Sequence, residues 1–393
     1  MDQKKEEPNI HSSKESNLCL NSFYYKNKAI FEKEKKAIFE KEWQLLCLEA
    51  ELPELGSFLV QEIVGKPVLV VKTKDGFFAY LNVCRHRGNS LVQEHQGKLK
   101  SSDFINCKYH AWTFKTKDGS LYTAPKFDET MISKKDLSLN SVRLETWLGI
   151  IFVNIDGNAP PLKEWLGDIP HLVEKYDMSR FDKYDLKNYP LKANWKAFID
   201  GYQECYHCAI VHPNLRKIYN LERYIVENFQ DSYSLHHCER KHEDGAEKIA
   251  EDLMGGNQND LGVWIWKYPN ITISCYPYGC FIMSADPLKT NQTNLRSYFR
   301  FTNSITQEQR KKFQEYIDTN VKEDANITEE IQKNIDCEAF IQGPLHPKRE
   351  NGVIFFHSLV RKSLSSYHST NVPLTPVEFE QTSCFLNSNK LDF

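Results

Sequence analysis

The sequence predicts an α+β protein in two parts, a small all-β domain followed by an α+β domain built on an antiparallel sheet. Apolar runs broken by glycine-containing turns fill residues 46–160, whereas strand-length and helix-length segments alternate over 180–365. A repeat with helical spacing precedes both parts. The chain has 393 residues, which is long enough to build a core for each domain.

The first 45 residues predict a polar leader and then a helix. Residues 1–20 begin with MDQKKEEPNIHSSKESN, whose low apolar content predicts disorder. The helix expected at 21–45 carries AIFEKE twice, from residues 29 and 37, and this step of eight residues brings both copies to similar faces. We expect this helix to pack on the second domain, with its Lys and Glu side chains in solvent.

Turn signals divide the first domain into hairpins. Gly65-Lys66-Pro67, Lys74-Asp75-Gly76 and Lys117-Asp118-Gly119 separate apolar runs of strand length, and WLGIIFVNI extends the pattern to about residue 155. PPLKEWLGDIPHLVEKY then predicts a linker and a helix. In the second domain NITISCYP and RSYFRFTNSI predict strands, while NWKAFIDGYQECYH, TQEQRKKFQEYIDTNV and residues 328–342 predict helices. The tail at 366–393 has no clear period.

Charge and cysteine content narrow the function. A formal net charge of -3 offers no electrostatic case for nucleic acid or an anionic membrane. No stretch approaches the roughly 18 apolar residues that span a bilayer, and the N-terminus lacks the apolar region of an export signal. The 11 cysteines are an odd number in a chain without such a signal, so we expect a reducing, cytoplasmic location.

Two short motifs in the first domain supply metal-ligand side chains, Cys84-Arg-His86 and Cys107-Lys-Tyr-His110. Two thiolates and two imidazoles suit either tetrahedral zinc or a [2Fe–2S] cluster in which two His replace two Cys on one iron. Each motif contributes one Cys and one His, which favours the two-iron cluster because each loop can then serve both irons. Zinc remains the alternative.

The surroundings of these motifs resemble the Rieske iron–sulfur domain. NVCRHRGNSL, and CKYHAWTF followed by DGSLY, carry the resemblance, which covers about residues 43–155. It implies that Cys84 and Cys107 hold the inner iron of a [2Fe–2S] cluster and that His86 and His110 hold the outer one.

The segment NWKAFIDGYQECYHCAIVHPNL in the second domain contains His207 and His212. Their spacing of five residues is about 140° around an ideal helix, so a regular helix would not direct both at one metal ion. Pro213 biases His212 out of the α region, which predicts that the helix unwinds there. Following a Rieske motif, the segment resembles the catalytic α subunit of the Rieske non-haem iron oxygenases, the ring-hydroxylating family with a helix-grip-like catalytic domain. Both resemblances together cover about residues 22–360 and imply that His207, His212 and a carboxylate hold Fe(II).

The same resemblance implies a role for Glu204. It occupies the position of the carboxylate that connects a cluster histidine, here His110, of one subunit to an iron histidine, here His207, of its neighbour. Glutamate at this position resembles the carnitine, glycine betaine and choline-type monooxygenases. Cys205 and Cys208 are expected to pack as thiols and not to act as a redox pair.

The third iron ligand is predicted from a weaker pattern. Relatives carry Asp eight residues before Gln in ED-x-x-x-x-E-x-x-Q-x-G-L. With Gln342 as the marker, position 334 is Asn, so we predict Asp336 with a shifted helix register. Asn334, Glu330 and Glu338 are the alternatives, as is the loss of this ligand and of activity. Relatives also tend to have Asn where this chain has Gly201, which predicts a wider pocket.

The predicted function is that of an oxygenase component. Electrons would come from NADH through the flavin of a separate reductase, O2 would be activated at Fe(II), and a C–H bond of a quaternary ammonium compound would be hydroxylated, with C–N cleavage or demethylation. Electron transfer between subunits implies a homotrimer. Candidates for an aromatic cage around the substrate cation are Trp264, Trp266, Tyr268, Tyr276 and Tyr278.

Three alternatives stay open at this point. The chain could be a ring-hydroxylating dioxygenase for an aromatic acid, or a Rieske electron carrier without mononuclear iron. It could also be a binding module stabilised by zinc.

Overall fold

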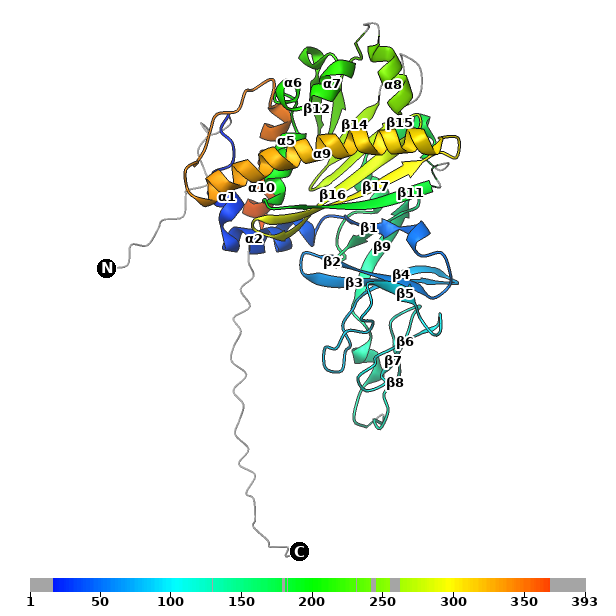
Figure 1. Cartoon of the computed structure of the whole chain (residues 1–393). Coiled ribbons are helices and arrows are strands. Elements are labelled where there is room, and N and C mark those ends of the chain that lie inside the picture. The colour runs from blue at the N-terminus through cyan, green and yellow to red at the C-terminus, as the bar shows by residue number, and fades with distance from the viewer. Residues whose placement is uncertain are drawn as a thin grey trace, which may run out of the picture.

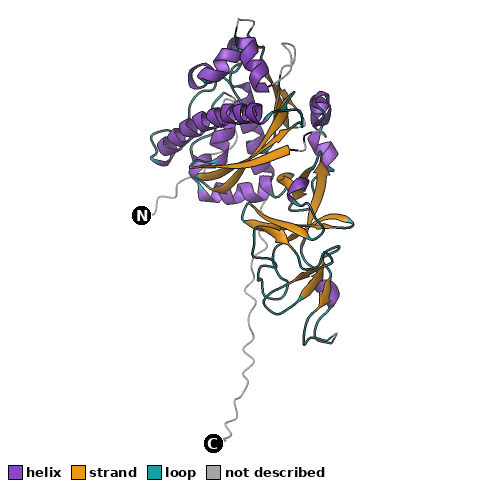
Figure 2. Cartoon of the chain, turned by 45° about the vertical axis from the view of Figure 1, so that its right-hand side comes forward, coloured by secondary structure: helices purple, strands orange, loops and turns teal. Residues whose placement is uncertain are grey.

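The computed structural model describes residues 17–367 except 129, 179–180, 182, 231, 242–244 and 255–261. Most of the predicted leader and almost all of the predicted tail lie outside the described residues. Two bodies rich in β-structure follow one another (Figure 1). The first contains a seven-stranded and a three-stranded sheet, and the second contains a seven-stranded sheet with helices packed around it (Figure 2).

The larger sheet of the first domain has the strand order β1-β10-β9-β4-β3-β2-β5. Its strands are β1 Gln44–Leu48, β2 Ser57–Ile63, β3 Lys66–Thr73, β4 Gly76–Leu81, β5 Gln96–Lys98, β9 Ser141–Trp147 and β10 Ile150–Asn154. The small sheet contains β6 Phe104–Asn106, β7 Thr113–Lys115 and β8 Leu121–Thr123. Tight turns join β2 to β3 and β3 to β4 at the predicted positions, and Gly65 and Gly76 have φ of 86° and 115°, a region that favours glycine.

The sheet of the second domain has the order β11-β17-β16-β15-β14-β13-β12. Its strands are β11 Lys183–Leu191, β12 Ile225–Phe229, β13 Tyr233–His237, β14 Val263–Lys267, β15 Ile271–Tyr276, β16 Gly279–Lys289 and β17 Gln292–Phe301. Neighbouring strands in all three sheets run antiparallel. The predicted α+β fold on an antiparallel sheet is confirmed.

The two faces of the second sheet bury different partners. Ile265, Ile273 and Ile282 share a core with Trp43 and Phe152 of the first domain, which joins the two bodies. On the other face Phe299 packs against Phe313 of the long helix α9, with ring centroids 6.4 Å apart. Helix α9, Gln307–Asp336, therefore lies across the sheet (Figure 1).

Helix α9 is longer than the sequence predicted. A capping box formed by Thr306 and Gln309 begins it, and neither Gly nor Pro occurs between 307 and 336 to interrupt it. The two helices expected over 306–321 and 328–342 are therefore one, which ends at Asp336. The other α-helices are α1 Phe23–Lys26, α2 Lys28–Glu34, α3 Leu162–Leu166, α4 Ile169–Val173, α5 Trp195–Tyr202, α6 Cys208–Val211, α7 Pro213–Ile218, α8 Ala246–Met254 and α10 Asn351–Ser366.

The N-terminal repeat differs from the expected single helix. It forms α1, α2 and the π-helical turn η1 Lys35–Phe39, and the chain enters β1 at Gln44 because this segment pairs with β10. Phe31 and Phe39, which are equivalent in the two copies, are both buried. Glu34, expected in solvent, is fully buried, and its carboxylate accepts a hydrogen bond from Nζ of buried Lys196 at 2.6 Å. Among the described helices, none combines the length and apolar character needed to cross a membrane.

Candidate metal centres

The loops that follow β4 and β6 bring the first set of predicted ligands together. In each loop the cysteine carbonyl accepts a hydrogen bond from the N–H four residues later, at 3.0 Å from Gly88 to Cys84 and at 3.0 Å from Ala111 to Cys107. The imidazole rings of His86 and His110 lie 4.7 Å apart between centroids. These loops therefore present two thiols and two imidazoles at one end of the domain.

The four side chains differ in exposure. Cys84 and Cys107 are buried, whereas His110 is exposed and His86 stacks at 4.7 Å on the indole of Trp112. Burial and the neighbouring Cys107 thiol raise the pKa of Cys84. Burial and the nearby His110 ring lower the pKa of His86. The thiols thus lie inside and the imidazoles face outward.

The spacing of these four side chains favours two metal ions over one. Ligands within about 2.3 Å of a single zinc ion lie at most about 4.6 Å from one another. Among the described residues, the Cys and His side chains of these two motifs are not among those with three possible ligand atoms within 4.8 Å of one another. The Cys84–Cys107 and His86–His110 pairs therefore suit a cluster in which each pair serves its own iron.

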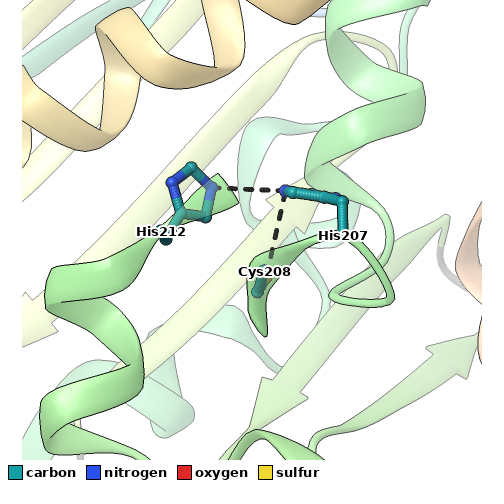
Figure 3. Close-up of side chains that lie close together, drawn as sticks. All are labelled: His207, Cys208 and His212. Atoms are coloured by element: carbon teal, nitrogen blue, oxygen red, sulfur yellow. Dashed lines mark hydrogen bonds between the residues drawn. The ribbon is translucent and has the colours of Figure 1, made fainter. Parts of the chain in front are cut away.

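The second centre lies where α5, α6 and α9 meet. His207 is the N-cap of α6, and His212 lies between α6 and α7 with φ of -112° and ψ of 77°, outside the helical region as Pro213 predicted. This break directs the Nε2 atoms of the two histidines at each other, 3.2 Å apart (Figure 3). A regular helix would have separated them.

Asp324 completes this centre. Its Oδ1 lies 3.0 Å from Nε2 of His212 and 3.4 Å from Nε2 of His207. Two imidazole nitrogens and a carboxylate oxygen from the middle of α9 thus converge on one point. Burial alone would raise the pKa of Asp324, but hydrogen bonds from both histidines lower it.

The prediction of Asp336 as the third ligand is not supported by this geometry. Asp336 lies twelve residues beyond Asp324 on the continuous helix α9, about 18 Å along its axis. Its carboxylate accepts hydrogen bonds from Gln332 at 2.8 Å and Asn291 at 3.4 Å. The alternative candidates also contact other groups: Glu330 pairs with Lys333, Glu338 pairs with Lys26, and the Asn334 amide donates to the carbonyl of Glu330.

A signal for Asp324 was present in the sequence. The pattern ED-x-x-x-x-E-x-x-Q occurs at residues 323–332, and Asp324 stands eight residues before Gln332. The prediction used Gln342 as its marker instead. Gln332 has a structural reason to be glutamine, because its buried Oε1 accepts the N–H of Asn194 at 2.9 Å, at the start of α5. This bond connects α9 to the helix that leads to His207.

Each histidine of the second centre is oriented by a carboxylate on its far side. The Nδ1 of His207 contacts Oε1 of Glu204, and the Nδ1 of His212 lies 2.8 Å from Oε2 of Glu323. These contacts leave both Nε2 atoms directed at the centre. Burial would lower the pKa of His207, but Asp324 and Glu204 outweigh it and raise that pKa to about 10. Glu323 was not singled out in the sequence.

Cys205 and Cys208 form a disulfide, whereas the sequence predicted packed thiols. The chain between α5 and α6 is not a regular helix, and the two Cα atoms lie 4.9 Å apart, within the usual range for disulfides. The Sγ of Cys208 lies 3.9 Å from Nε2 of His207 (Figure 3).

A cavity of about 130 Å³ opens on one side of the centre, and we call it the inner cavity. Its lining includes His207, His212 and Asp324. Four aromatic side chains also line it: Tyr202, Tyr219, Tyr224 and Trp264. Of the five aromatic residues proposed from the sequence, Trp264 lines this cavity and the other four do not.

A larger cavity of about 400 Å³ also adjoins the centre, and we call it the outer cavity. Glu204, His207, Asp324 and Gly201 line both cavities. A Cβ atom at Gly201 would meet nothing within 4 Å. The missing side chain therefore leaves open space beside the centre, in agreement with the wider pocket that the sequence predicted.

Comparisons with known proteins identify both domains. Residues 42–143 match the family described as Rieske [2Fe-2S] domain, and residues 177–366 match Ring hydroxylating alpha subunit (catalytic domain). The carnitine monooxygenase oxygenase subunit of Escherichia coli (strain K12) is 28% identical over 353 residues, 86% of this chain and 91% of that protein. The glycine betaine monooxygenase oxygenase subunit of Pseudomonas aeruginosa (strain UCBPP-PA14) is 32% identical over 206 residues, 52% of this chain and 47% of that protein.

Solved structures show the same fold. The quaternary ammonium Rieske monooxygenase CntA in complex with L-carnitine is 25% identical, with a TM-score of 0.73 over 88% of this chain and 95% of that chain. Naphthalene 1,2-dioxygenase with bound indole is 19% identical, with a TM-score of 0.70 over 89% and 92% of the two chains. The two matched domains imply an iron–sulfur cluster, a mononuclear iron and a reductase partner. The chain belongs to the Rieske non-haem iron oxygenases and combines a Rieske [2Fe–2S] domain with the catalytic domain of the ring-hydroxylating α subunit.

Proposed function

We propose that this chain is the oxygenase component of a monooxygenase for a quaternary ammonium compound. O2, two electrons and two protons are consumed, one oxygen atom enters a substrate C–H bond, and the other leaves as water. When the hydroxylated carbon is bound to nitrogen, the product loses its C–N bond by cleavage or demethylation. The observation that carries the proposal is the convergence of His207, His212 and Asp324 beside the aromatic inner cavity.

The residues of the second centre fit mononuclear iron. Two histidines and one carboxylate are the facial set of non-haem Fe(II) oxygenases, which leaves other positions for O2. We propose His207, His212 and Asp324 as the ligands, because their donor atoms lie within 3.4 Å of one another. Bound there, Fe(II) supplies the activation of O2. Glu204 and Glu323 hold the imidazole rings in the orientation that this binding requires.

We further propose that Cys84 and Cys107 hold one iron of the cluster and that His86 and His110 hold the other. Buried thiolates suit the inner iron, and the outward-facing imidazoles place the outer iron near the surface. His110 would thus be accessible to a neighbouring subunit. The loops that carry the proposed cluster ligands and helix α6 lie at opposite ends of the folded molecule (Figure 1). This separation argues against electron transfer within one subunit.

The route between subunits runs through Glu204 in this proposal. Glu204 contacts His207 and lines the outer cavity, so its carboxylate could also accept an N–H from His110 of a neighbouring subunit. Exposed apolar side chains near Glu204 and beside His110 support such docking. Tyr206 and Ile210 are 61% and 88% exposed near Glu204, and Tyr109 is 53% exposed beside His110. Head-to-tail packing of this kind closes into a ring, and we propose a homotrimer.

Two further assignments complete the proposal. The reductase would carry flavin and oxidise NADH, so neither cofactor need bind to this chain. The cytoplasm would supply that NADH, and we propose it as the location of the protein.

The test combines spectroscopy with turnover. We expect the purified chain to show the visible and EPR spectra of a Rieske cluster and to contain about three irons. With a reductase, NADH and O2, a panel of quaternary ammonium compounds should then include a substrate that is converted into an aldehyde and an amine, the products of C–N cleavage or demethylation. A colourless zinc protein, or about two irons with no turnover, would contradict the proposal.

The panel also includes aromatic acids, the substrates of the main alternative within the family. Among the described residues that line the inner cavity, none is Lys or Arg. An aromatic carboxylate would therefore lack an ion-pairing partner there, which favours the quaternary ammonium substrate.

A further inference from the structure

We infer that Cys205 and Cys208 are a reversible redox pair that consumes hydrogen peroxide beside the second centre. This activity goes beyond the hydroxylation proposed above and rests on that proposal in one respect, because O2 must be reduced at this centre. Three properties of the pair carry the inference: its geometry, its position beside the centre and its separation from solvent.

The geometry lets the disulfide open and close while the surrounding turn is kept. The Cα atoms of Cys205 and Cys208 lie 4.9 Å apart, within the usual range for bonded cysteines. The N–H of Cys208 donates to the carbonyl of Cys205 at 3.3 Å, and the N–H of His207 donates to Oε2 of Glu204 at 3.2 Å. These hydrogen bonds do not involve sulfur, so the two thiols of the reduced pair remain within reach of each other.

The pair lies next to the proposed iron ligands. The Sγ of Cys208 is 3.9 Å from Nε2 of His207, the atom that is directed at the centre (Figure 3). The possible ligand atoms of His207, Cys208 and His212 all lie within 4.8 Å of one another. Cys205 and Cys208 also line the inner cavity. A small oxidant released at the centre therefore reaches Cys208 without leaving the cavity.

Bulk solvent reaches the pair poorly. Cys205 and Cys208 are both buried, whereas Cys337 is exposed. An oxidant in solution therefore meets Cys337 before the pair, and an oxidant formed at the centre meets the pair before Cys337. This difference separates the two sources of oxidant in an experiment.

Uncoupled turnover supplies the oxidant. When O2 takes up two electrons and two protons and no substrate is hydroxylated, the product is hydrogen peroxide. The reductase that serves hydroxylation provides these electrons. In the reducing location proposed above, the pair is a dithiol before the peroxide forms.

The reaction with peroxide has two steps. The Cys208 sulfur attacks one peroxide oxygen, the O–O bond breaks, an S–O bond forms and one water leaves, which gives a sulfenic acid. The Cys205 sulfur then attacks the Cys208 sulfur, the S–S bond forms, the S–O bond breaks and a second water leaves. The dithiol is thus oxidised by two electrons and the peroxide is reduced to two waters. Two molecules of a small thiol restore the dithiol by exchange and become one disulfide themselves.

Other cysteines provide matched controls. Cys275 and Cys280 are opposite each other in β15 and β16, are buried, and are not among the residues that line either cavity. Cys238 lines the inner cavity, but its thiol donates to the carbonyl of Asn220 at 3.4 Å, and burial raises its pKa to about 12. A thiol with so high a pKa is a poor nucleophile. We call Cys238, Cys275, Cys280 and Cys337 the control cysteines.

Mass spectrometry after uncoupled turnover tests the inference. The full chain is reduced with a phosphine, loaded anaerobically with Fe(II), and supplied with reductase, NADH and O2, without and with choline. Catalase in the buffer removes peroxide that escapes, and the uncoupled O2 is the O2 consumed in excess of the aldehyde formed. We expect about one disulfide per chain between Cys205 and Cys208 after the first few equivalents of uncoupled O2, while the control cysteines stay thiols.

Single variants separate the roles of the two cysteines. In Cys205→Ser the sulfenic acid at Cys208 has no thiol to close on, so we expect dimedone, a reagent for sulfenic acids, to label Cys208 about tenfold more than in the wild type. Cys208→Ser should leave Cys205 unlabelled. Cys275→Ser, outside both cavities, should form the Cys205–Cys208 disulfide as the wild type does.

Three results would overturn the inference and leave the proposed function intact. These are a disulfide that resists the phosphine in the folded chain, a pair that stays reduced while uncoupled O2 is consumed, and oxidation that catalase prevents. Absence of O2 consumption in every sample, with iron and cluster present, would overturn both the inference and the proposed function.

Discussion

Oδ1 of Asp324 lies 3.0 Å from Nε2 of His212, and the carboxylate reaches this position from the middle of α9. Helix α9 crosses the sheet and ends twelve residues later at Asp336. The position at which α9 passes the two histidines therefore determines which of its carboxylates contacts them.

Asp324→Asn should remove the mononuclear iron and spare the cluster. The amide is neutral and a weaker ligand than the carboxylate, so we expect iron to fall from about three to about two per chain with an unchanged Rieske spectrum. Asp336→Asn makes the same chemical change on the same helix and should retain all of the iron. Equal iron loss in the two variants would refute the assignment of Asp324.

Glu204→Gln should slow electron transfer even when the iron site is kept filled. The carboxylate contacts Nδ1 of His207, and its replacement by an amide weakens the proposed connection between two imidazoles. We expect the reduced cluster to be reoxidised about 10- to 100-fold more slowly in single-turnover stopped-flow experiments run with excess Fe(II), which keeps about three irons bound although His207 is less well oriented. Glu204→Asp keeps the charge but shortens the reach, and we expect an intermediate rate. An unchanged rate in Glu204→Gln would remove the bridging role.

Glu323→Gln should act on the iron site instead. Its carboxylate lies 2.8 Å from Nδ1 of His212, so its loss reduces the basicity and the fixed orientation of that ring. We expect iron affinity to fall about 10- to 100-fold in a competition assay with a chelator, while the cluster stays intact. Glu330→Gln alters an exposed ion pair on the same helix and serves as the control.

Lys196→Met should destabilise the fold. Lys196 and Glu34 are both fully buried and pair at 2.6 Å, so removal of the lysine leaves an uncompensated carboxylate in the core. We expect a loss of about 3–5 kcal/mol in the free energy of unfolding, measured by chemical denaturation. The double variant Glu34→Gln/Lys196→Met should recover most of this loss, because no buried charge remains. A double variant no more stable than the single one would mean that packing, and not charge, explains the effect.

Local sequence was enough to predict much of the fold, including the hairpin turns and the helix break at His212. The hairpins of the first domain follow from their turns, and the break at His212 follows from Pro213. The ligands proposed for the cluster lie in two short motifs, so this prediction needed no knowledge of distant contacts. The disulfide between Cys205 and Cys208 was missed because it depends on the irregular geometry between α5 and α6.

By itself, the sequence determined the fold class, and it was enough to propose the cluster ligands and the two histidines for iron, because each of these sets lies in residues close together in the chain. Only the tertiary structure decided that Asp324 and not Asp336 faces the histidines, that Glu323 orients His212, and which aromatic rings surround the inner cavity. These choices depend on the uninterrupted length of α9 and on how it packs across α5 and the sheet. The physical reason is that one turn of a helix moves a side chain by about 5.4 Å, more than a metal–ligand bond can span.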